Sequence, residues 1–397
     1  MHGTDQARTT RGEDCVARAR SVTEVLRAAA DRIESERRLP TDVLSSLHDA
    51  RLFRLLLPRS LDGDELDPLH LAKVTEIIAA ADASTAWCLG QAAGCAMSAA
   101  FLDPRIAHRI FGPREAVLAW GAGAQGRAIA VDGGYRITGT WTFASGLHNA
   151  TWLGAHSKVF EADGRPRLRP DGRQLERTGL LPLDQAKVHD VWQVMGLCGT
   201  GSDSYEVSDL FLPEEYTFDR EGTTDLRESG TVYKFPGSLV YAGAFGGVML
   251  GIAKGTLTEL AALAKTKTPR GAPSSLLESP VFQTQLAQLE ARLRAARAYH
   301  HSTLARVWDE AERLPALTLD HRIDIRLAAT HAINQGVEIV TEAYRVAGQT
   351  AIFDTNPFER RLRDALTASQ QVQGRATHYT TVGRHLLGLA PDTMMFL

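Results

Sequence analysis

The sequence predicts an α+β protein in which a helical region, a β-rich region and a second helical region follow one another. Three observations lead to this prediction. Apolar residues repeat at helical spacing up to about residue 113, short alternating runs with turns replace them, and long helical segments return near residue 226. We therefore expect three domains, at residues 1–113, 114–225 and 226–397.

Composition places the chain among globular proteins. Hydrophobic residues make up 44% of the chain and charged residues 23%, which excludes intrinsic disorder and a long coiled coil. A net charge of −3 gives no excess of positive charge for a nucleic acid or a membrane surface. The four cysteines form no CxxC pair, and residues 1–13 lack a secretory pattern. We therefore expect free thiols in a reducing cytoplasm.

The first region is predicted to contain four helices. An amphipathic segment covers residues 16–37, and Pro40-Thr41-Asp42 begins a second helix with residues suited to capping. Asp67-Pro68 begins a third helix, and residues 84–101 form a fourth. The fourth consists almost entirely of small apolar residues, so we expect it to pack closely against other helices.

The middle region is predicted to form a β-barrel or sandwich. Asp132-Gly133-Gly134 separates two alternating runs, residues 127–131 and 135–141, which is typical of a hairpin. Further strands are expected at residues 117–120, 151–160, 179–182, 186–194 and 205–212.

The third region is predicted to be a bundle of four long helices, at residues 237–265, 279–311, 319–346 and 358–387. The apolar stretch 237–253 is rich in glycine and shorter than the roughly 20 apolar residues that span a bilayer. We expect it to be buried on all sides in protein.

Two sequence motifs that can indicate binding sites do not predict such sites in this chain. Gly121 to Gly126 matches the dinucleotide pattern GxGxxG, but a hairpin follows it where phosphate binding needs a helix N-terminus. We interpret it as a loop. Asp320, His321, Asp324 and His331 are close in sequence, and surface charges with a helix cap explain them better than a metal site.

The segment Gly133-Gly-Tyr-Arg-Ile-Thr-Gly-Thr-Trp-Thr-Phe-Ala-Ser-Gly146, together with the helix–β–helix order, resembles the acyl-CoA dehydrogenase fold. The closer resemblance is to flavin-dependent monooxygenases of that fold, such as 4-hydroxyphenylacetate hydroxylases and dibenzothiophene monooxygenases. It covers about residues 20–390. It implies that Phe143 covers the flavin ring and that the Ser145 hydroxyl meets flavin N5. The alternative is that Trp141 and Phe143 face the core and Ser145 opens a turn.

Two further patterns carry the resemblance. Met195 to Ser202 is similar to a Gly-Thr-Gly-Ser turn of the family, in which Thr200 and Ser202 would face flavin or substrate. A plain turn between strands is the alternative. Arg270 and Gln283 are similar to family residues that reach the flavin phosphates, and guanidinium donors suit phosphate oxygens.

The segment 347–364 departs from the dehydrogenases. Of their glycine-rich turn only Gly348 remains, so the choice between FAD and FMN stays open. The position of their catalytic glutamate falls on Val372, between Gln371 and Gln373, and neither amide can act as a base. Dehydrogenation by that route is therefore not expected.

Several monooxygenases of the fold have a histidine near position 371, which this chain lacks. His378 is a candidate replacement, with a surface role as the alternative, and His148 is a second candidate. His378 and His385 lie seven residues apart, which predicts that they share one helical face.

These resemblances predict a two-component monooxygenase. A separate NAD(P)H-dependent reductase would supply reduced FAD, or FMN, and O₂ would form a C4a-hydroperoxide that oxygenates a phenol, an indole or a polyketide-type aromatic. Trp120, Trp141 and Phe143 are expected to exclude water, Ser145 to support N5, and His378 to move a proton. A homotetramer or homodimer is expected. The alternatives are an FAD-dependent acyl-CoA dehydrogenase and a flavin-free scaffold of the same fold.

Overall fold

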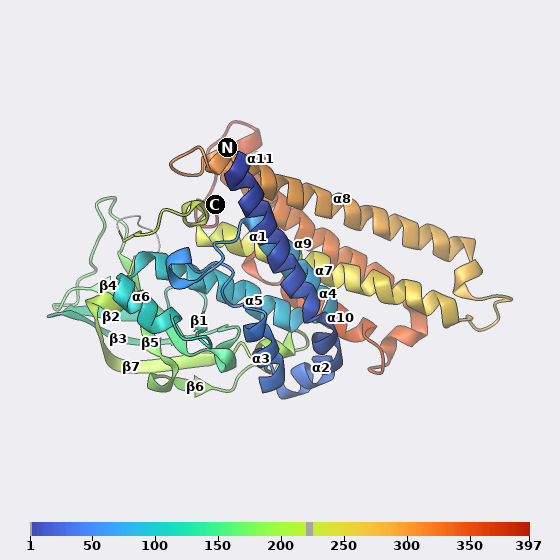
Figure 1. The fold of residues 1–397 in the computed structure, drawn as a ribbon, viewed down its shortest axis with the longest axis horizontal. Coiled ribbons are helices and arrows are strands. Elements are labelled where there is room, and N and C mark those ends of the chain that lie inside the picture. Colours follow the sequence, from blue (N-terminus) through green and yellow to red (C-terminus); the bar gives the residue numbers. More distant parts are fainter. Residues whose placement is uncertain (1, 220–224) are drawn as a thin grey trace.

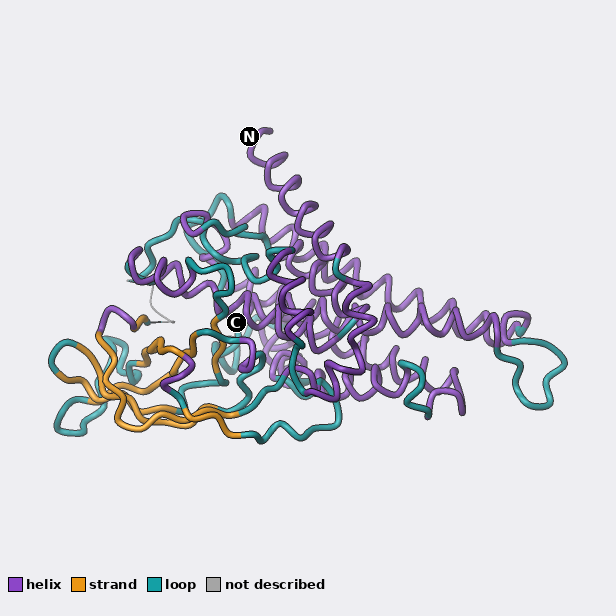
Figure 2. The backbone as a smooth tube through the Cα atoms, turned by 60° about the horizontal axis from the view of Figure 1, so that its bottom comes forward, coloured by secondary structure: helices purple, strands orange, loops and turns teal. Residues whose placement is uncertain are grey.

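The structure is a computed structural model that describes residues 2–219 and 225–397, with side chains described from residue 8 onward. Helices form one side of the molecule and a β-sheet the other, as predicted (Figure 1). The loop between α7 and α8 lies at the end of the helices that is farthest from the sheet (Figures 1 and 2). Residues 220–224, next to the predicted boundary at residue 225, lie outside the described residues.

The first part of the chain contains α1 (His2–Ser21), α2 (Thr23–Glu36), α3 (Thr41–Asp49), α4 (Pro68–Ala81), α5 (Ala83–Ala96) and α6 (Pro104–Phe111). Asp67 and Asp82 cap α4 and α5, because their carboxylates accept from the backbone N–H groups of His70 and Thr85. The prediction of a single helix at residues 16–37 is wrong, because the helix is interrupted at Val22, between α1 and α2. The short helix α6 was not predicted.

In the part of the chain that the structure describes, eight strands form one sheet with the order β6-β7-β3-β2-β4-β5-β8, and β1 pairs with β4. They are β1 (Leu118–Trp120), β2 (Gly126–Val131), β3 (Gly134–Trp141), β4 (Trp152–Phe160), β5 (Glu176–Pro182), β6 (Lys187–His189), β7 (Ser204–Pro213) and β8 (Thr217–Phe218). The predicted hairpin is confirmed, because β2 and β3 pair antiparallel across Gly133. The GxGxxG segment is followed by β2 and not by a helix, which confirms that it is a loop.

The strand predicted at residues 186–194 ends early, at His189. The backbone N–H groups of Val191 and Trp192 both donate to Asp203 Oδ1, at 2.7 Å, and are therefore withdrawn from strand pairing.

The last part of the chain contains α7 (Gly237–Thr266), α8 (Pro280–Ala311), α9 (Leu319–Ala347), α10 (Phe358–Ser369) and α11 (Thr377–Leu386). The continuous helix predicted at residues 358–387 is wrong. A 3₁₀ turn, Val372–Gly374, interrupts it, and the Gln371 side chain accepts from the Gln373 backbone N–H in place of a helical bond.

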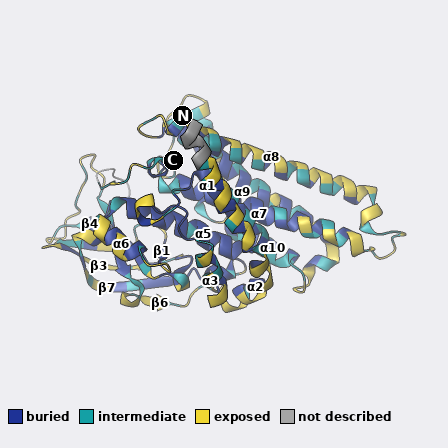
Figure 3. Cartoon of the chain, in the orientation of Figure 1, coloured by how far each residue is buried: buried dark blue, intermediate teal, exposed yellow. Residues whose placement is uncertain are grey.

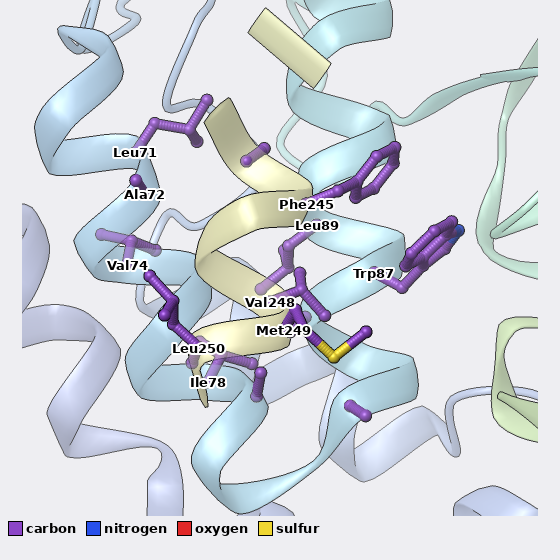
Figure 4. Packing of buried hydrophobic residues seen from close by; sticks show 14 of the residues in the cluster. Leu71, Ala72, Val74, Ile78, Trp87, Leu89, Phe245, Val248, Met249 and Leu250 are labelled. Carbon is purple, nitrogen blue, oxygen red and sulfur yellow. The ribbon is translucent and has the colours of Figure 1, made fainter. Parts of the chain in front are cut away.

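The core lies where α7 packs against α4, α5 and α9, and buried side chains from these helices meet there. Figure 3 shows the burial of these helices, and Figure 4 shows the side chains of α4, α5 and α7. Helix α7 is long and apolar enough to cross a membrane by length and composition, but most of its most apolar window is buried in protein, as predicted. Gly251 permits this packing, because a Cβ there would lie 2.2 Å from the Glu76 carbonyl oxygen of α4.

Candidate active site

Phe143 stands just beyond the end of β3 with its ring presented outward. Its side chain is 63% exposed, and its φ of 60° lies in the left-handed region that non-glycine residues rarely adopt. The Trp192 ring meets it at 82°, with 6.0 Å between the ring centroids. A large aromatic residue held outward in a strained conformation is typical of a ligand-contacting position.

Ser145 begins a row of hydrogen bonds directly behind Phe143. Its Oγ lies 3.1 Å from Trp87 Nε1 and 2.7 Å from Ser202 Oγ. Ser202 Oγ lies 2.7 Å from Thr200 Oγ1, and Thr200 Oγ1 donates to the Leu197 carbonyl at 2.8 Å. Ser145, Thr200 and Ser202 are all buried, so this row of side chains, which we call the hydroxyl row, is shielded from competing water.

Backbone hydrogen bonds hold the two turns of the hydroxyl row together. Gly146 N donates to the Thr200 carbonyl at 2.8 Å, and Ala144 N donates to the Asp203 carbonyl at 3.1 Å. The structure therefore brings together Phe143, Ser145, Thr200 and Ser202, four of the residues predicted to bind the cofactor.

Trp87 was not predicted, although it fixes the hydroxyl row from the side of α5. Its ring stacks on Phe245 of α7 with 3.9 Å between centroids, and Phe245 in turn stacks on Tyr241 (Figure 4 shows the first two rings). The available signal was a lone tryptophan, with its ring N–H donor, in the run of small residues 84–101.

His148 and Asp203 form a second polar pair beside the hydroxyl row. His148 Nε2 lies 2.7 Å from Asp203 Oδ2, and the His148 side chain is 32% exposed whereas that of Asp203 is 4% exposed. The same carboxylate holds Val191 N and Trp192 N, so Asp203 fixes the Trp192 ring against Phe143. Gly201 makes room, because a Cβ there would lie 2.6 Å from His148 Cδ2.

Asp364 of α10 supports the same loop from the bundle. Its carboxylate accepts from Leu197 N at 2.6 Å, and its side chain is buried. Burial, with the charges of Asp82 and Glu34 nearby, raises the pKa of Asp364 to about 7, although the bond from Leu197 opposes this. A prominent anchor of the loop 195–203 is therefore a carboxyl group that titrates near neutrality.

Two of the predicted aromatic residues lie in the core of the sheet domain instead of on its surface. Trp141 is fully buried, its Nε1 donates to the His156 carbonyl at 2.8 Å, and its ring stacks on Tyr205. Trp120 is 6% exposed and its ring meets that of His156. Residues two apart share a face along a continuous strand. However, β3 ends at Trp141, and the φ of 60° at Phe143 turns its side chain outward while Trp141 points inward.

His378 lies away from the hydroxyl row. Its Nε2 donates to the Val372 carbonyl at 2.6 Å and its ring meets Phe396, while burial lowers its pKa. Among the described residues, no hydrogen bond or ring contact links His378 to Ser145. The helix of His378, α11, packs against α9. A role for His378 as the base at Ser145 therefore has no geometric support within one chain.

Arg270 and Gln283 also lie far from the hydroxyl row. Arg270 is in the α7–α8 loop and Gln283 is at the start of α8, where its Nε2 donates to the Leu277 carbonyl. Both are exposed. This loop is at the opposite end of the molecule from the sheet (Figure 1), so the two residues cannot reach Ser145 of the same chain.

The remaining polar clusters have structural explanations. His321 forms a capping box with Thr318 at the start of α9, and His385 pairs with Asp320, as the interpretation of caps and surface charges predicted. No group of potential metal ligands occurs within residues 2–219 and 225–397. A cavity of about 390 Å³ lies in the first helical part, and ion pairs Arg51–Asp62 and Arg114–Asp49 account for much of its charged lining.

Comparison with known proteins gives the same order of domains. An acyl-CoA dehydrogenase N-terminal domain model matches residues 15–103, and the C-terminal domain model matches residues 244–373. Together they cover more than half of the chain. These matches agree with the predicted fold class.

Two relatives and one solved structure extend over nearly the whole chain. Indole-3-acetate monooxygenase of Pseudomonas putida is 29% identical over 92% of this chain and 91% of its own length. The flavin-dependent monooxygenase oxygenase subunit HsaA of Mycobacterium tuberculosis is 25% identical over 93% of this chain and 94% of its own. XiaF from Streptomyces, solved with FADH2 and glycerol, has a TM-score of 0.90 at 23% identity and covers 98% of this chain and 99% of its own.

Proposed function

We propose that this chain, which belongs to the acyl-CoA dehydrogenase family, is a flavin-dependent monooxygenase that hydroxylates an electron-rich aromatic small molecule as the oxygenase component of a two-component system. A separate NAD(P)H-dependent reductase would supply the reduced flavin, which we take to be FAD, with FMN as the alternative. A phenol, an indole or a polyketide-type aromatic would be the substrate.

The exposed Phe143 ring beside the buried Ser145 hydroxyl is the observation that carries this proposal. The residues fit a flavin, because a planar heteroaromatic ring can stack on an exposed aromatic face while its N5 edge meets a hydroxyl two residues along. The ring of Phe143 is open to solvent on its outer side, where side chains of this chain leave room for a partner. If other side chains of the chain covered the Phe143 ring, no face would remain on which a flavin could stack.

Reduced flavin, when bound, supplies the two electrons that monooxygenation of an aromatic ring by O₂ requires. The chain's own side chains hold and orient that group. Phe143 and Trp192 would cover one ring face, and Ser145 would fix N5. The stacked Trp87 and Phe245 form an apolar wall behind Ser145 and keep bulk water from that side.

Proton transfer from the substrate needs a different residue from the one first predicted. His378 is tied to Val372, and the amides Gln371 and Gln373 are not bases. We assign this role to His148, which is open to solvent, lies three residues from Ser145 and is oriented by the buried Asp203.

A second copy of the chain would complete the site. Arg270 and Gln283 suit flavin phosphates but lie at the far end of their own chain, so we propose that they bind the phosphates of flavin held by a neighbouring copy in a homodimer or homotetramer. The exposed apolar residues Leu386, Leu387 and Met395 near the C-terminus support such contacts.

We further propose that the protein works in a reducing cytoplasm, and its four free cysteines support this.

Single-turnover oxidation tests the proposed function. The purified chain is mixed anaerobically with FAD reduced chemically, and ¹⁸O₂ is then added with a panel of phenols and indoles. We expect one ¹⁸O atom in a hydroxylated product and a low yield of hydrogen peroxide. A chain that binds no reduced flavin, or that gives only peroxide with every member of the panel, would contradict the proposal. An acyl-CoA dehydrogenase would instead hold oxidised FAD and bleach it with an acyl thioester.

A further inference from the structure

The hydroxyl row has only one satisfactory direction for its protons. The Trp87 indole N–H can only donate, and the Leu197 carbonyl at the other end can only accept. Each hydroxyl between them has a single proton. Thr200 uses its proton on Leu197, so Ser202 must donate to Thr200, and Ser145 must donate to Ser202.

The reverse direction is less stable for a specific reason. The Leu197 carbonyl would keep its bonds from Thr200 N and Trp192 Nε1, both at 3.1 Å. However, its oxygen and Thr200 Oγ1 would lie 2.8 Å apart with no proton between them, and this repulsion in a buried site is poorly screened. Thr200 therefore sets the direction of the whole row, although its hydroxyl is two hydrogen bonds away from Ser145 Oγ.

This direction leaves Ser145 as an acceptor only. Its proton is committed to Ser202, one lone pair receives the Trp87 N–H, and the remaining lone pair can receive a donor from a ligand. Reduced flavin carries a hydrogen on N5, whereas N5 of oxidised flavin is a bare acceptor. Building on the proposed function, we infer that Thr200 and Ser202 are positioning residues that make the site select reduced over oxidised flavin through the orientation of the Ser145 hydroxyl.

Selection of this kind suits a chain that receives its flavin already reduced. Binding that favours the reduced state draws the cofactor from a reductase, and it releases the oxidised product of each turnover for another reduction. Trp87, held by stacking on Phe245, keeps the donor end of the row fixed while this exchange occurs.

The test compares the dissociation constants of reduced and oxidised FAD for the full chain, measured anaerobically and in air by equilibrium dialysis. The wild type should bind reduced FAD more tightly. Thr200→Val keeps the shape of the side chain and removes its hydroxyl, so Ser202 is free to donate to Ser145 and Ser145 to donate outward. The ratio of interest is the dissociation constant of oxidised FAD divided by that of reduced FAD. We expect this ratio to fall about five- to tenfold in the variant, which corresponds to the free energy of one hydrogen bond.

Three further variants separate orientation from structural damage. Thr200→Ser restores the hydroxyl and should restore the wild-type ratio within about twofold. Ser202→Ala removes the acceptor of the Ser145 proton and should lower the ratio as Thr200→Val does. Trp87→Phe removes a donor but leaves the Ser145 proton on Ser202, so it should weaken both states together and spare the ratio.

The midpoint potential of bound FAD gives an independent reading, because weaker selection of the reduced state must move it to a more negative value. An unchanged ratio and potential in folded Thr200→Val and Ser202→Ala would overturn the inference, and so would a wild-type chain that binds oxidised FAD as tightly as reduced FAD. A wild-type chain that binds neither state would contradict the proposed function instead.

Discussion

The hydroxyl row and the cluster around Arg326 are both buried polar groups, but they are satisfied in different ways. The Arg326 side chain is fully buried and donates to the Phe396 carbonyl and to Gln373 Oε1, and His378 packs beside Phe396. The partners of Arg326 come from the 3₁₀ turn Val372–Gly374 and from the C-terminal segment, which covers the cluster. The hydroxyl row instead ends at Ser145, next to an exposed Phe143, with one lone pair to spare.

The difference separates a structural cluster from a binding site. A buried guanidinium without a carboxylate partner is costly, and burial lowers the pKa of Arg326 to about 10. Its carbonyl and amide partners offset part of that cost and fasten the C-terminal segment to α9. The hydroxyl row carries no net charge, so it can stay buried while it waits for a ligand. Four substitutions, from the largest expected effect to the smallest, test whether this distinction holds.

Arg326→Ala should have the largest effect, on stability. It leaves the Phe396 carbonyl and Gln373 Oε1 without their donor in a buried cavity, and we expect a loss of about 3–5 kcal/mol of unfolding free energy in urea titration. Arg292→Ala is the matched control, because Arg292 pairs with Glu338 and Glu342 on the surface and should matter little. Equal stability of the two variants would contradict a structural role for the Arg326 cluster.

Asp364→Asn should change how the free energy of unfolding depends on pH. Asp364 anchors Leu197, the residue whose carbonyl ends the hydroxyl row. The folded pKa of Asp364, about 7, lies above its unfolded value, so the folded state binds the extra proton. Its contribution to stability is therefore full below about pH 4 and declines as pH rises to about 7, with a slope of at most about 1.4 kcal/mol per pH unit.

The asparagine variant lacks this decline, so its melting temperature should gain on that of the wild type between pH 4 and pH 7. Thermal unfolding at several pH values measures the difference. Parallel curves for the two proteins would show that the carboxyl group at Leu197 does not titrate in this range.

Ser145→Ala should affect the contact with flavin and the yield of product more than the stability of the fold. Loss of the hydroxyl removes the N5 acceptor, and we expect the yield of hydroxylated product per reduced flavin to fall about tenfold while peroxide rises. Unfolding free energy should fall by about 1–2 kcal/mol, because Trp87 N–H loses its partner. Ser145→Thr is the control that keeps the hydroxyl. Undiminished product from the alanine variant would rule out a role for Ser145.

Phe143→Ala should have the smallest effect and leave folding unchanged, since the ring is exposed. Affinity for reduced FAD should fall about three- to tenfold through lost stacking, as read by equilibrium dialysis. Phe143→Tyr keeps the ring and should bind as the wild type does. If alanine and tyrosine variants bind alike, Phe143 does not contact the flavin.

Local sequence patterns determined most of the fold. Helical spacing predicted α7, α8 and α9 nearly to the residue and the start of α4, and Asp132-Gly133-Gly134 predicted the β2–β3 hairpin. Predictions failed where a single side chain overrides a continuous pattern, as at Gln371, which ends the helix run before α11. They also failed at residues 190–194, where Asp203 takes two backbone donors from a predicted strand.

The sequence alone determined that this protein is built as helices, a sheet and helices, and its resemblance to flavin-dependent monooxygenases made Phe143, Ser145, Thr200 and Ser202 candidates for one site. Hydrophobic periodicity and turn chemistry depend on residues that are close together in sequence, so the amino-acid sequence is sufficient to reveal them. Only the tertiary structure decided that Trp141 turns inward, that His378 faces Val372, and that Trp87 reaches Ser145 from 58 residues away. The direction of a proton along a hydroxyl row depends on which donor and which acceptor stand at its two ends, and folding alone brings those ends together.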